Sequence, residues 1–263
     1  MSEITDIVGN IQYRLAFSGG WIDQPFMSKL NPDVVGSMVV AAVVPEFRFM
    51  DRAGICGGTR SIALDVWKGT VPDGDKMTLV RQLYEIENAG KEDPSGSQDM
   101  IGLVYPGISR LDYDYNHEGG YFPVHIESCN DATVAKWLGD NLYIVPVEVR
   151  PEGYYPLGRK NFDPEWVRRL GQSGKDCYEA IVNMDLVGLG GAFNECMLCW
   201  GTLLPDVVEH ETLKVDLAGL LRYYQGKYAG AMYSGCGGGY LFVVSDVPVP
   251  GGFKVNIKVE KNE

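Results

Sequence analysis

Three glycine-bearing loops place the tightest limits on how this chain can fold. They are residues 18–23 (SGGWID), 53–63 (AGICGGTRSIA) and 234–240 (SGCGGGY). Glycine lets consecutive backbone N–H groups converge on an anion, but it also makes tight turns, and a turn is the more frequent explanation of any single loop. Three such loops in one chain favour a site in which backbone surrounds a small ligand.

The first loop ends a strand-like run near the start of the sequence. Apolar Leu15 and Phe17 come before Gly19 and Gly20, and Asp23 follows. One interpretation is a hairpin turn, for which glycine pairs are common. The other is a site where backbone comes close to a small ligand and a carboxylate binds it.

Hydrophobic periodicity predicts strands and helices mixed along the chain, which indicates an α+β fold. The predicted strands are residues 11–17, 37–44, 109–115, 121–128, 141–149 and 252–260, and a further strand before the last glycine loop. The predicted helices are residues 78–89, 98–107, 217–227 and a pair within 165–204 that breaks near Gly188–Gly191. Residues 150–165, rich in Pro, Gly and Tyr, are predicted to form an exposed loop.

Charge and composition exclude several classes of protein. The 263 residues carry a net charge of -12, which repels a phosphate-rich polymer, so we expect no nucleic-acid binding. The longest apolar run, residues 38–44, is too short to cross a bilayer. The first ten residues have no signal-peptide pattern, and the free cysteines then predict a cytoplasmic protein. Only Cys196 and Cys199 are close in sequence, so no zinc site is expected.

The motifs together resemble the GHMP kinases, the superfamily of galactokinase, homoserine kinase and mevalonate kinase, and in particular the heptose and fucose kinase branch. That family opens with an arginine on an early strand and an aspartate nine residues later, a spacing that Arg14 and Asp23 share. Its middle carries a glutamate, then Pro-Ser-Gly, then an aspartate that starts a helix. Glu87 and Asp99 take those places in EIENAGKEDPSGSQD, and SGCGGGY is similar to the family's last glycine loop.

The resemblance implies a kinase that transfers the γ-phosphate of ATP to a hydroxyl of a sugar-like metabolite. Such a transfer needs a positioned hydroxyl and neutralised charge on the phosphoryl group. Asp99 is then the catalytic carboxylate, and Arg14 stabilises the phosphoryl group or holds Asp99. The structural alternatives are a helix-terminal aspartate and a strand-edge arginine. Asp23 would bind substrate hydroxyls together with the backbone of Gly19 and Gly20.

The resemblance also implies which residues hold Mg²⁺ and the nucleotide. Glu87 and Thr59 would bind Mg²⁺, although Glu87 could equally lie on the solvated face of its helix. The nucleotide-binding residues would be Gly54, Gly57, Gly58, Thr59, Ser61, Gly235, Gly237 and Gly238. The family's phosphate loop reads Gly-Leu-Gly-Ser-Ser, whereas this chain has GICGGTRS, in which Arg60 is a further candidate phosphate contact.

The family's architecture gives two domains with a cleft between them. Residues 1–135 would form a domain like the second domain of ribosomal protein S5, and residues 136–263 a ferredoxin-like domain. The segment between Asp23 and the phosphate loop is shorter than in the family. A non-catalytic GHMP-like metabolite-binding protein is therefore the alternative function. The expected partner is a small sugar-like substrate, with neither nucleic acid nor membrane, and a homodimer is left open.

Overall fold

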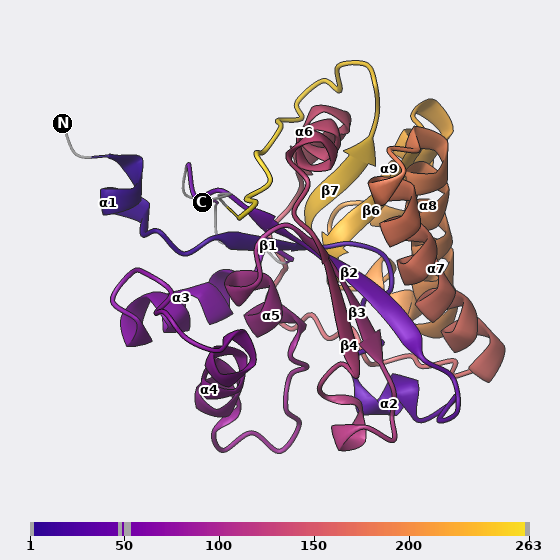
Figure 1. The fold of residues 1–263 in the computed structure, drawn as a ribbon. Helices are drawn as coiled ribbons and strands as arrows, with labels where there is room; N and C mark the ends of the chain where they lie inside the picture. Colours follow the sequence, from indigo (N-terminus) through magenta and orange to yellow (C-terminus); the bar gives the residue numbers. More distant parts are fainter. Residues whose placement is uncertain (1–2, 47–48, 50–53, 261–263) are drawn as a thin grey trace.

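The N-terminal half of the chain forms a four-stranded antiparallel sheet (Figure 1). The computed structural model describes residues 3–46, 49 and 54–260. The strands of this sheet are β1 (Tyr13–Ala16), β2 (Gly36–Val43), β3 (Ile108–Tyr113) and β4 (His125–Cys129), in the order β1-β2-β3-β4. Strand β1 lies at one edge, where its Arg14 pairs with Ala42 of β2.

A second antiparallel sheet comes from the C-terminal half. Its strands are β5 (Leu142–Pro146), β6 (Gly230–Gly235) and β7 (Gly238–Val244), in the order β5-β7-β6. The predicted strand at 252–260 is wrong, because this segment makes only single bridges. Phe253 bridges to Ile144 of β5, and Ile257 bridges to Val43 of β2. The segment therefore connects the two sheets.

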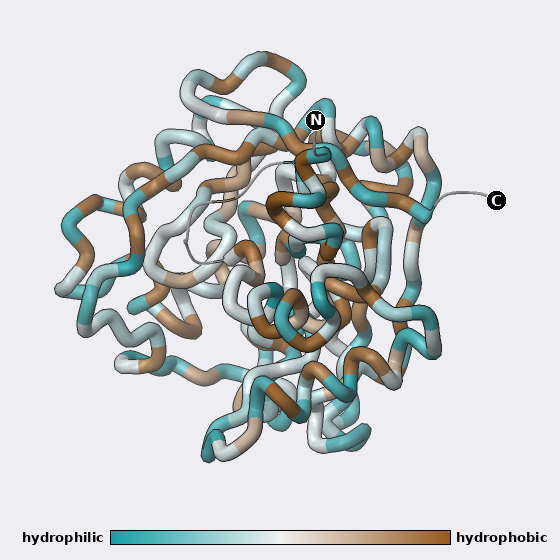
Figure 2. The backbone as a smooth tube through the Cα atoms, turned by 90° about the vertical axis from the view of Figure 1, so that its left-hand side faces the viewer, coloured by the Kyte–Doolittle hydropathy of each residue, from teal (hydrophilic) through white to brown (hydrophobic). Residues whose placement is uncertain are grey.

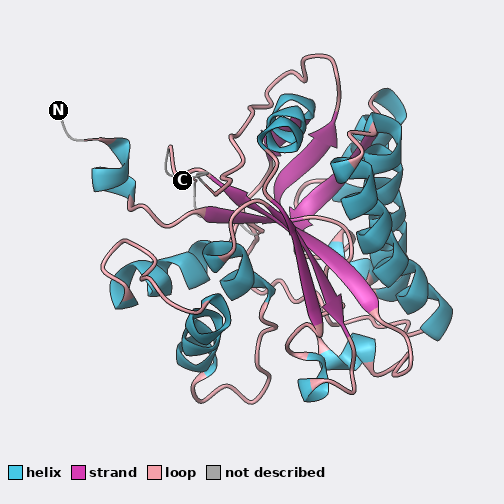
Figure 3. Cartoon of the chain, in the orientation of Figure 1, coloured by secondary structure: helices cyan, strands magenta, loops and turns pink. Residues whose placement is uncertain are grey.

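Helices flank the strands on both sides in Figure 3. On one side α3 (Gly57–Val66), α4 (Lys76–Asn88) and α5 (Gln98–Val104) form a group, and α5 contacts β1. On the other side α7 (Pro164–Val182) and α8 (Leu186–Leu203) pack against each other. The remaining elements are α1 (Ile4–Val8), α2 (Pro25–Ser28), α6 (Ala132–Asn141), α9 (Leu217–Lys227) and two 3-10 turns, Glu118–Gly120 and Pro205–Val207. This mixture confirms the predicted α+β class.

Aspartate side chains fix where five of the helices begin. The N-cap residues of α4, α6, α7, α8 and α9 accept hydrogen bonds from backbone N–H groups of the first turn; they are Asp75, Asp131, Asp163, Asp185 and Asp216. A cap of this kind stabilises a helix by about 1 kcal/mol. Helices α3 and α5 have no side-chain cap, and both begin at the candidate site described below.

The break between α7 and α8 lies at residues 183–185, and the predicted break at Gly188–Gly191 is wrong. These glycines are inside α8. Gly190 lies directly against the backbone of Ala229 and Gly230, where β6 begins, and a Cβ there would overlap the Ala229 carbonyl group. The glycine thus allows a close approach of helix and strand rather than a turn.

We expect Gly190→Ala to lower the free energy of unfolding by about 1–3 kcal/mol, because the added methyl group must push α8 away from β6. Gly191→Ala is the matched control, since no atom lies within 4 Å of its Cβ position. There the helix propensity of alanine should raise the free energy of unfolding by up to about 1 kcal/mol. Urea unfolding measures both changes. Equal shifts in the two variants would contradict this account of the helix–strand contact.

Phenylalanine rings join the two sheets through α8. The ring centroid of Phe17, which follows β1, lies 5.4 Å from that of Phe193 in α8 and 5.6 Å from that of Phe242 in β7. All three side chains are fully buried. The predicted domain boundary, between residues 135 and 136, falls inside α6, and α7 of the second half packs onto β2 of the first. The division into two domains stays a prediction.

Hydrophobic and hydrophilic residues are interspersed along the backbone (Figure 2). Within the described ranges, no helix has both the length and the apolar character needed to span a bilayer. The same residues contain no group of three or more His, Cys, Asp or Glu side chains placed to hold a metal ion. All six cysteines are free thiols.

Candidate active site

A buried ion pair links β1 to the start of α5. Arg14 is 4% exposed, and its guanidinium pairs with the Asp99 carboxylate in the first turn of α5. Gly102 lies one turn further along α5, and a Cβ there would overlap the Arg14 side chain. The missing side chain at Gly102 therefore lets the arginine reach along the helix. Burial lowers the pKa of Arg14, and the charge of Asp23 opposes that shift.

The start of α3 wraps around this ion pair. Thr59 Oγ1 lies 3.5 Å from Asp99 Oδ2, and Arg14 Nη1 donates to the Gly54 carbonyl oxygen at 3.5 Å. Cys56, the N-cap residue, has a left-handed backbone with φ 60° and ψ 33°. Apart from the helix's own backbone, no atom of the described residues lies within 4 Å of the Cβ positions of Gly57 and Gly58. The first turn of α3, which has no side-chain cap, therefore has open space beside Gly57 and Gly58, close to Asp99.

Asp23 is a buried carboxylate in the turn that follows β1. It is 1% exposed, and its Oδ2 atom has no hydrogen-bond partner. Burial raises the pKa of Asp23 to about 6, against the attraction of Arg14. The carboxylate lies against Gly96, where a Cβ would overlap it. The Pro-Ser-Gly segment before α5 is thus shaped around this side chain.

Glu87 adds a third carboxylate, from the last turn of α4. Its side chain is 13% exposed, and Oε1 lies 3.6 Å from Nζ of Lys91, which follows the end of the helix. Its Oε2 atom is buried without a hydrogen-bond partner, and its charge acts on Arg14 and Cys56. A carboxylate with one uncommitted oxygen fits Mg²⁺, which takes few protein ligands beside phosphate and water. Glu87 therefore fits the Mg²⁺ ion that the resemblance to GHMP kinases implies.

Unsatisfied buried polar atoms gather in this one region. In the described part of the chain, buried side-chain atoms without a hydrogen-bond partner occur in Arg14, Asp23, Glu87 and Gln98, and the buried Oδ1 atom of Asp99 has only its ion pair with Arg14. Buried polar groups in proteins are almost always paired, so such a concentration needs an explanation. A polar ligand that supplies the missing partners is the direct one.

Comparison with solved structures shows the fold that carries this site. The mevalonate kinase of Methanococcus jannaschii matches with a TM-score of 0.57 and 8% identity, over 89% of this chain and 89% of that chain. A D-glycero-D-manno-heptose 1-phosphate kinase from Bacteroides thetaiotaomicron matches with a TM-score of 0.53 and 11% identity, over 95% of this chain and 96% of that chain. The chain has the GHMP-kinase fold. At these identities the likeness shows the fold alone. No protein-family profile and no curated protein sequence matches the chain.

Within this GHMP-kinase fold, the glycine pair of the first loop has a packing role. Gly19 has φ +89° and lies against Ser37 and Met38 of β2, where a Cβ would overlap backbone. Gly20 lies against Trp200 of α8, whose indole N–H donates to the Gly20 carbonyl oxygen at 3.1 Å. Both residues are buried in these contacts. The packing gives no support to their predicted part in substrate binding.

The last glycine loop is a tight hairpin between β6 and β7. The N–H of Gly237 donates to the Val207 carbonyl oxygen at 2.9 Å, and the N–H of Gly239 donates to the Glu148 carbonyl oxygen at 3.0 Å. Gly235 pairs with Gly238 across the hairpin. The N–H of Gly237 is therefore committed within the protein, and its predicted phosphate contact receives no support. The phosphate contacts at Gly235 and Gly238 stay predictions.

The last glycine loop still borders the candidate site. Gly54 lies against the backbone of Ser234, the residue before the hairpin turn, and a Cβ at Gly54 would overlap it. The Gly54 carbonyl oxygen in turn accepts from Arg14. The first, second and third glycine loops thus lie around one centre, and in the second loop Gly57 and Gly58 have open space beside them among the described residues. Its first residue, Ala53, lies outside the described residues.

Two other residues of the second loop have structural partners. Arg60 is 5% exposed, and its guanidinium donates to the Ile11 carbonyl oxygen at 2.8 Å and the Val8 carbonyl oxygen at 2.7 Å. Arg60 therefore holds the segment before β1 in place. Because its guanidinium makes these bonds within the protein, the predicted contact of Arg60 with phosphate receives no support. Ser61 Oγ donates to the Gly57 carbonyl oxygen at 2.9 Å, within α3.

Sequence reasoning missed three features of the site. Tyr84 lies three residues before Glu87 on α4, and the Asp23 charge contributes to raising its pKa, after burial and Tyr121. Helical spacing from Glu87 could have predicted that placement. Cys56 lies in the second glycine loop, and the sequence pattern predicts no role for it. A cavity of about 180 Å³ beside α3 includes Tyr13 and Ile55 among its lining residues, and no sequence pattern marks it.

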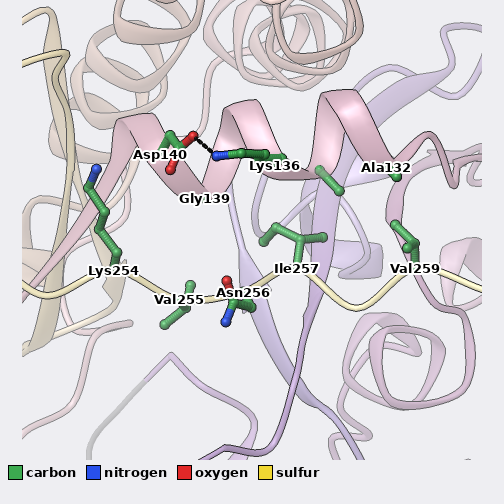
Figure 4. A pocket seen from close by; sticks show the side chains of 10 residues that line it. Ala132, Lys136, Gly139, Asp140, Lys254, Val255, Asn256, Ile257 and Val259 are labelled. Atoms are coloured by element: carbon green, nitrogen blue, oxygen red, sulfur yellow. Dashed lines mark hydrogen bonds and ion pairs between the residues drawn. The ribbon is translucent and has the colours of Figure 1, made fainter.

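A hollow of about 460 Å³ lies elsewhere, between α6 and the C-terminal segment (Figure 4). Lys136 and Asp140 form an ion pair on its rim, with side chains 76% and 54% exposed. Exposed pairs of this kind contribute little to stability. None of the unsatisfied buried atoms belongs to its lining residues, so the Arg14–Asp99 region is the better candidate for catalysis.

Proposed function

We propose that this protein is a MgATP-dependent phosphotransferase that acts on a hydroxyl group of a small sugar-like molecule. One observation carries the proposal: the unsatisfied buried polar atoms of the described residues gather beside the open, uncapped N-terminus of α3. An exposed helix N-terminus favours phosphate, and nearby carboxylates can bind a metal and a hydroxyl. The GHMP-kinase fold agrees with this chemistry without deciding it.

Asp99 is the group placed to act on the acceptor hydroxyl. Its side chain is 26% exposed, next to Thr59 and the open end of α3. Its carboxylate can orient the hydroxyl and accept its proton as the oxygen attacks. Arg14 holds Asp99 in position through the ion pair and contributes positive charge near the transferred phosphoryl group.

The nucleotide would lie across the start of α3. Its phosphates fit the open backbone at Gly57 and Gly58, where the helix dipole favours negative charge. The cavity of about 180 Å³ next to these glycines has the aromatic rings of Tyr13 and Phe49 in its wall and suits a purine base. Mg²⁺, held by Glu87 and Thr59 together with the phosphates, would neutralise charge on the phosphoryl group.

The acceptor would lie on the other side of Asp99, toward Asp23 and Tyr84. The unpaired Oδ2 atom of Asp23 is an acceptor for a substrate hydroxyl, and the Tyr84 phenol is in electrostatic contact with that carboxylate. Hydroxyl groups are the ligands that can satisfy a buried carboxylate without adding charge. A neutral polyhydroxylated acceptor therefore fits this side of the site.

We expect MgATP to stabilise the protein against heat. Binding to the folded state alone raises the free energy of unfolding by RT ln(1 + [L]/Kd), or about 2.7 kcal/mol at a hundredfold excess over Kd. For a chain of this size that is about 5–10 °C in Tm. The measurement is thermal unfolding with millimolar MgATP, MgADP or inorganic polyphosphate, together with a screen of sugars and other small alcohols for ATP consumption.

The outcomes separate the possible functions. Shifts with both ATP and ADP support a nucleotide-dependent enzyme, and ATP consumption with one acceptor identifies the reaction. An equal shift with polyphosphate would mean that the start of α3 binds phosphate without recognising the nucleoside. No shift with any of the three, in a well-folded sample, would favour the non-catalytic metabolite-binding protein.

A further inference from the structure

Trp21 is in an unusual backbone conformation for a tryptophan. Its φ is +82°, in the left-handed region that bulky residues rarely adopt. It is held there by a turn in which the Gln24 N–H donates to the Trp21 carbonyl oxygen at 3.0 Å. A strained conformation of this kind persists only where the surroundings enforce it, and it is common at functional sites.

The side chain of Trp21 is also placed differently from its neighbours. Every residue from Ile11 to Asp23 is buried except Trp21, which keeps part of its surface exposed. Its ring centroid lies 5.8 Å from that of Phe26, which in turn stacks on Phe162 at 5.7 Å. The turn therefore keeps Trp21 partly exposed, two residues from the buried carboxylate of Asp23.

The indole of Trp21 lies near the wall of the candidate site. Burial raises the pKa of the Cys236 thiol, and the charge of Arg150 and, after it, the Trp21 indole oppose that rise. Cys236 belongs to the glycine hairpin whose Ser234 lies against Gly54, and the Gly54 carbonyl oxygen accepts from Arg14. Trp21 thus belongs to the Asp23 turn and lies near the glycine hairpin.

We propose that Trp21 is a substrate-binding residue: its indole forms an apolar platform for the acceptor, which is therefore a ring sugar with an apolar C–H face. This assignment rests on the proposed function and narrows its substrate class. Asp23 binds hydroxyl groups on the rim of such a ring, while the indole covers the face. An acyclic polyol offers the same hydroxyls but no fixed face, so it should bind more weakly.

The test compares Trp21→Gly with Trp21→Phe. Glycine adopts φ near +82° without strain, so the first variant removes the ring but keeps the turn, whereas the second keeps an aromatic ring. The probes are pyranoses (D-glucose, D-galactose, D-mannose) and the acyclic polyol sorbitol. We expect Trp21→Gly to raise KM for the accepted pyranose about tenfold, with kcat changed less than about threefold, and Trp21→Phe to restore most of the loss.

The control is Tyr223→Ala, which removes a 57% exposed aromatic side chain from α9 and should leave KM unchanged. Equal KM values in the wild type and Trp21→Gly would overturn the assignment, as would a preference for sorbitol or no response to any pyranose. The MgATP shift is measured on the same samples. Its absence would instead count against the proposed function, so the two failures can be told apart.

Discussion

Asp99→Asn is expected to lower turnover of the accepted substrate by about 10²–10⁴-fold, while MgATP still raises Tm. The amide keeps the size and most of the hydrogen bonds of the carboxylate, but it cannot take a proton from the acceptor hydroxyl. Asp99 is 26% exposed and borders the open start of α3, where the phosphates are proposed to lie. Steady-state ATP consumption with the acceptor found in the screen measures the loss.

This variant also removes the anionic partner of Arg14, so its fold needs a separate check. Breaking a buried pair leaves one charge uncompensated, although Asp23 remains close enough to act on Arg14. Turnover should therefore be compared well below the Tm of the variant. Asp93→Asn, in the exposed loop before α5, is the matched control and should keep full activity. An Asp99→Asn enzyme with wild-type turnover would rule out Asp99 as the proton acceptor.

The central ion pair could be predicted from the sequence because short motifs carry it. Arg14 lies on a strand of four buried residues, and Asp99 lies in the first turn of a short helix; both elements were predicted from apolar spacing. The resemblance to the GHMP kinases then predicted that these two residues, 85 positions apart in the sequence, belong to one site. Periodicity alone predicts each element but not their contact, since it says nothing about which side chains meet across the fold.

The glycines could not be interpreted in the same way. The sequence shows where the chain lacks side chains, but the reason lies in neighbours that are distant along the chain. Gly20 lies against Trp200, Gly190 against Ala229, and Gly54 against Ser234. Each close approach depends on the packing of two elements, whereas the sequence offers only the local options of a turn or a ligand loop.

The C-terminal segment failed as a prediction for a related reason. Residues 252–260 have the alternation of a strand, with Val255 and Ile257 buried. An alternating pattern of apolar and polar residues shows only that one face of a segment is buried. Here that face is buried while the segment crosses from β5 to β2. Pattern and burial agree, yet the hydrogen-bond partners of the segment are split between the two sheets.

Asp23 links the proposed function to stability. Its pKa is about 6 in the folded protein and 3.8 in the unfolded chain, because burial disfavours the charged carboxylate. The folded protein therefore binds this proton more tightly than the unfolded chain does. The resulting contribution to the free energy of unfolding is fully present below about pH 4 and is lost as pH rises through about 6. The difference of about two pKa units corresponds to about 3 kcal/mol lost by pH 8.

We therefore expect Asp23→Asn to be more stable than the wild type at pH 8, by up to about 3 kcal/mol or about 6–12 °C in Tm, and equally stable near pH 4. The same variant should bind the acceptor more weakly, since it loses the charged partner of the substrate hydroxyls. Urea unfolding from pH 4 to 8 measures the difference, with Asp33→Asn as the exposed control expected to stay within about 0.5 kcal/mol. If the difference in stability between Asp23→Asn and the wild type does not change with pH, the charge of the buried carboxylate is not what limits stability. If Asp23→Asn instead gains stability at pH 8 and loses acceptor binding, Asp23 is a group retained for function at the expense of the fold.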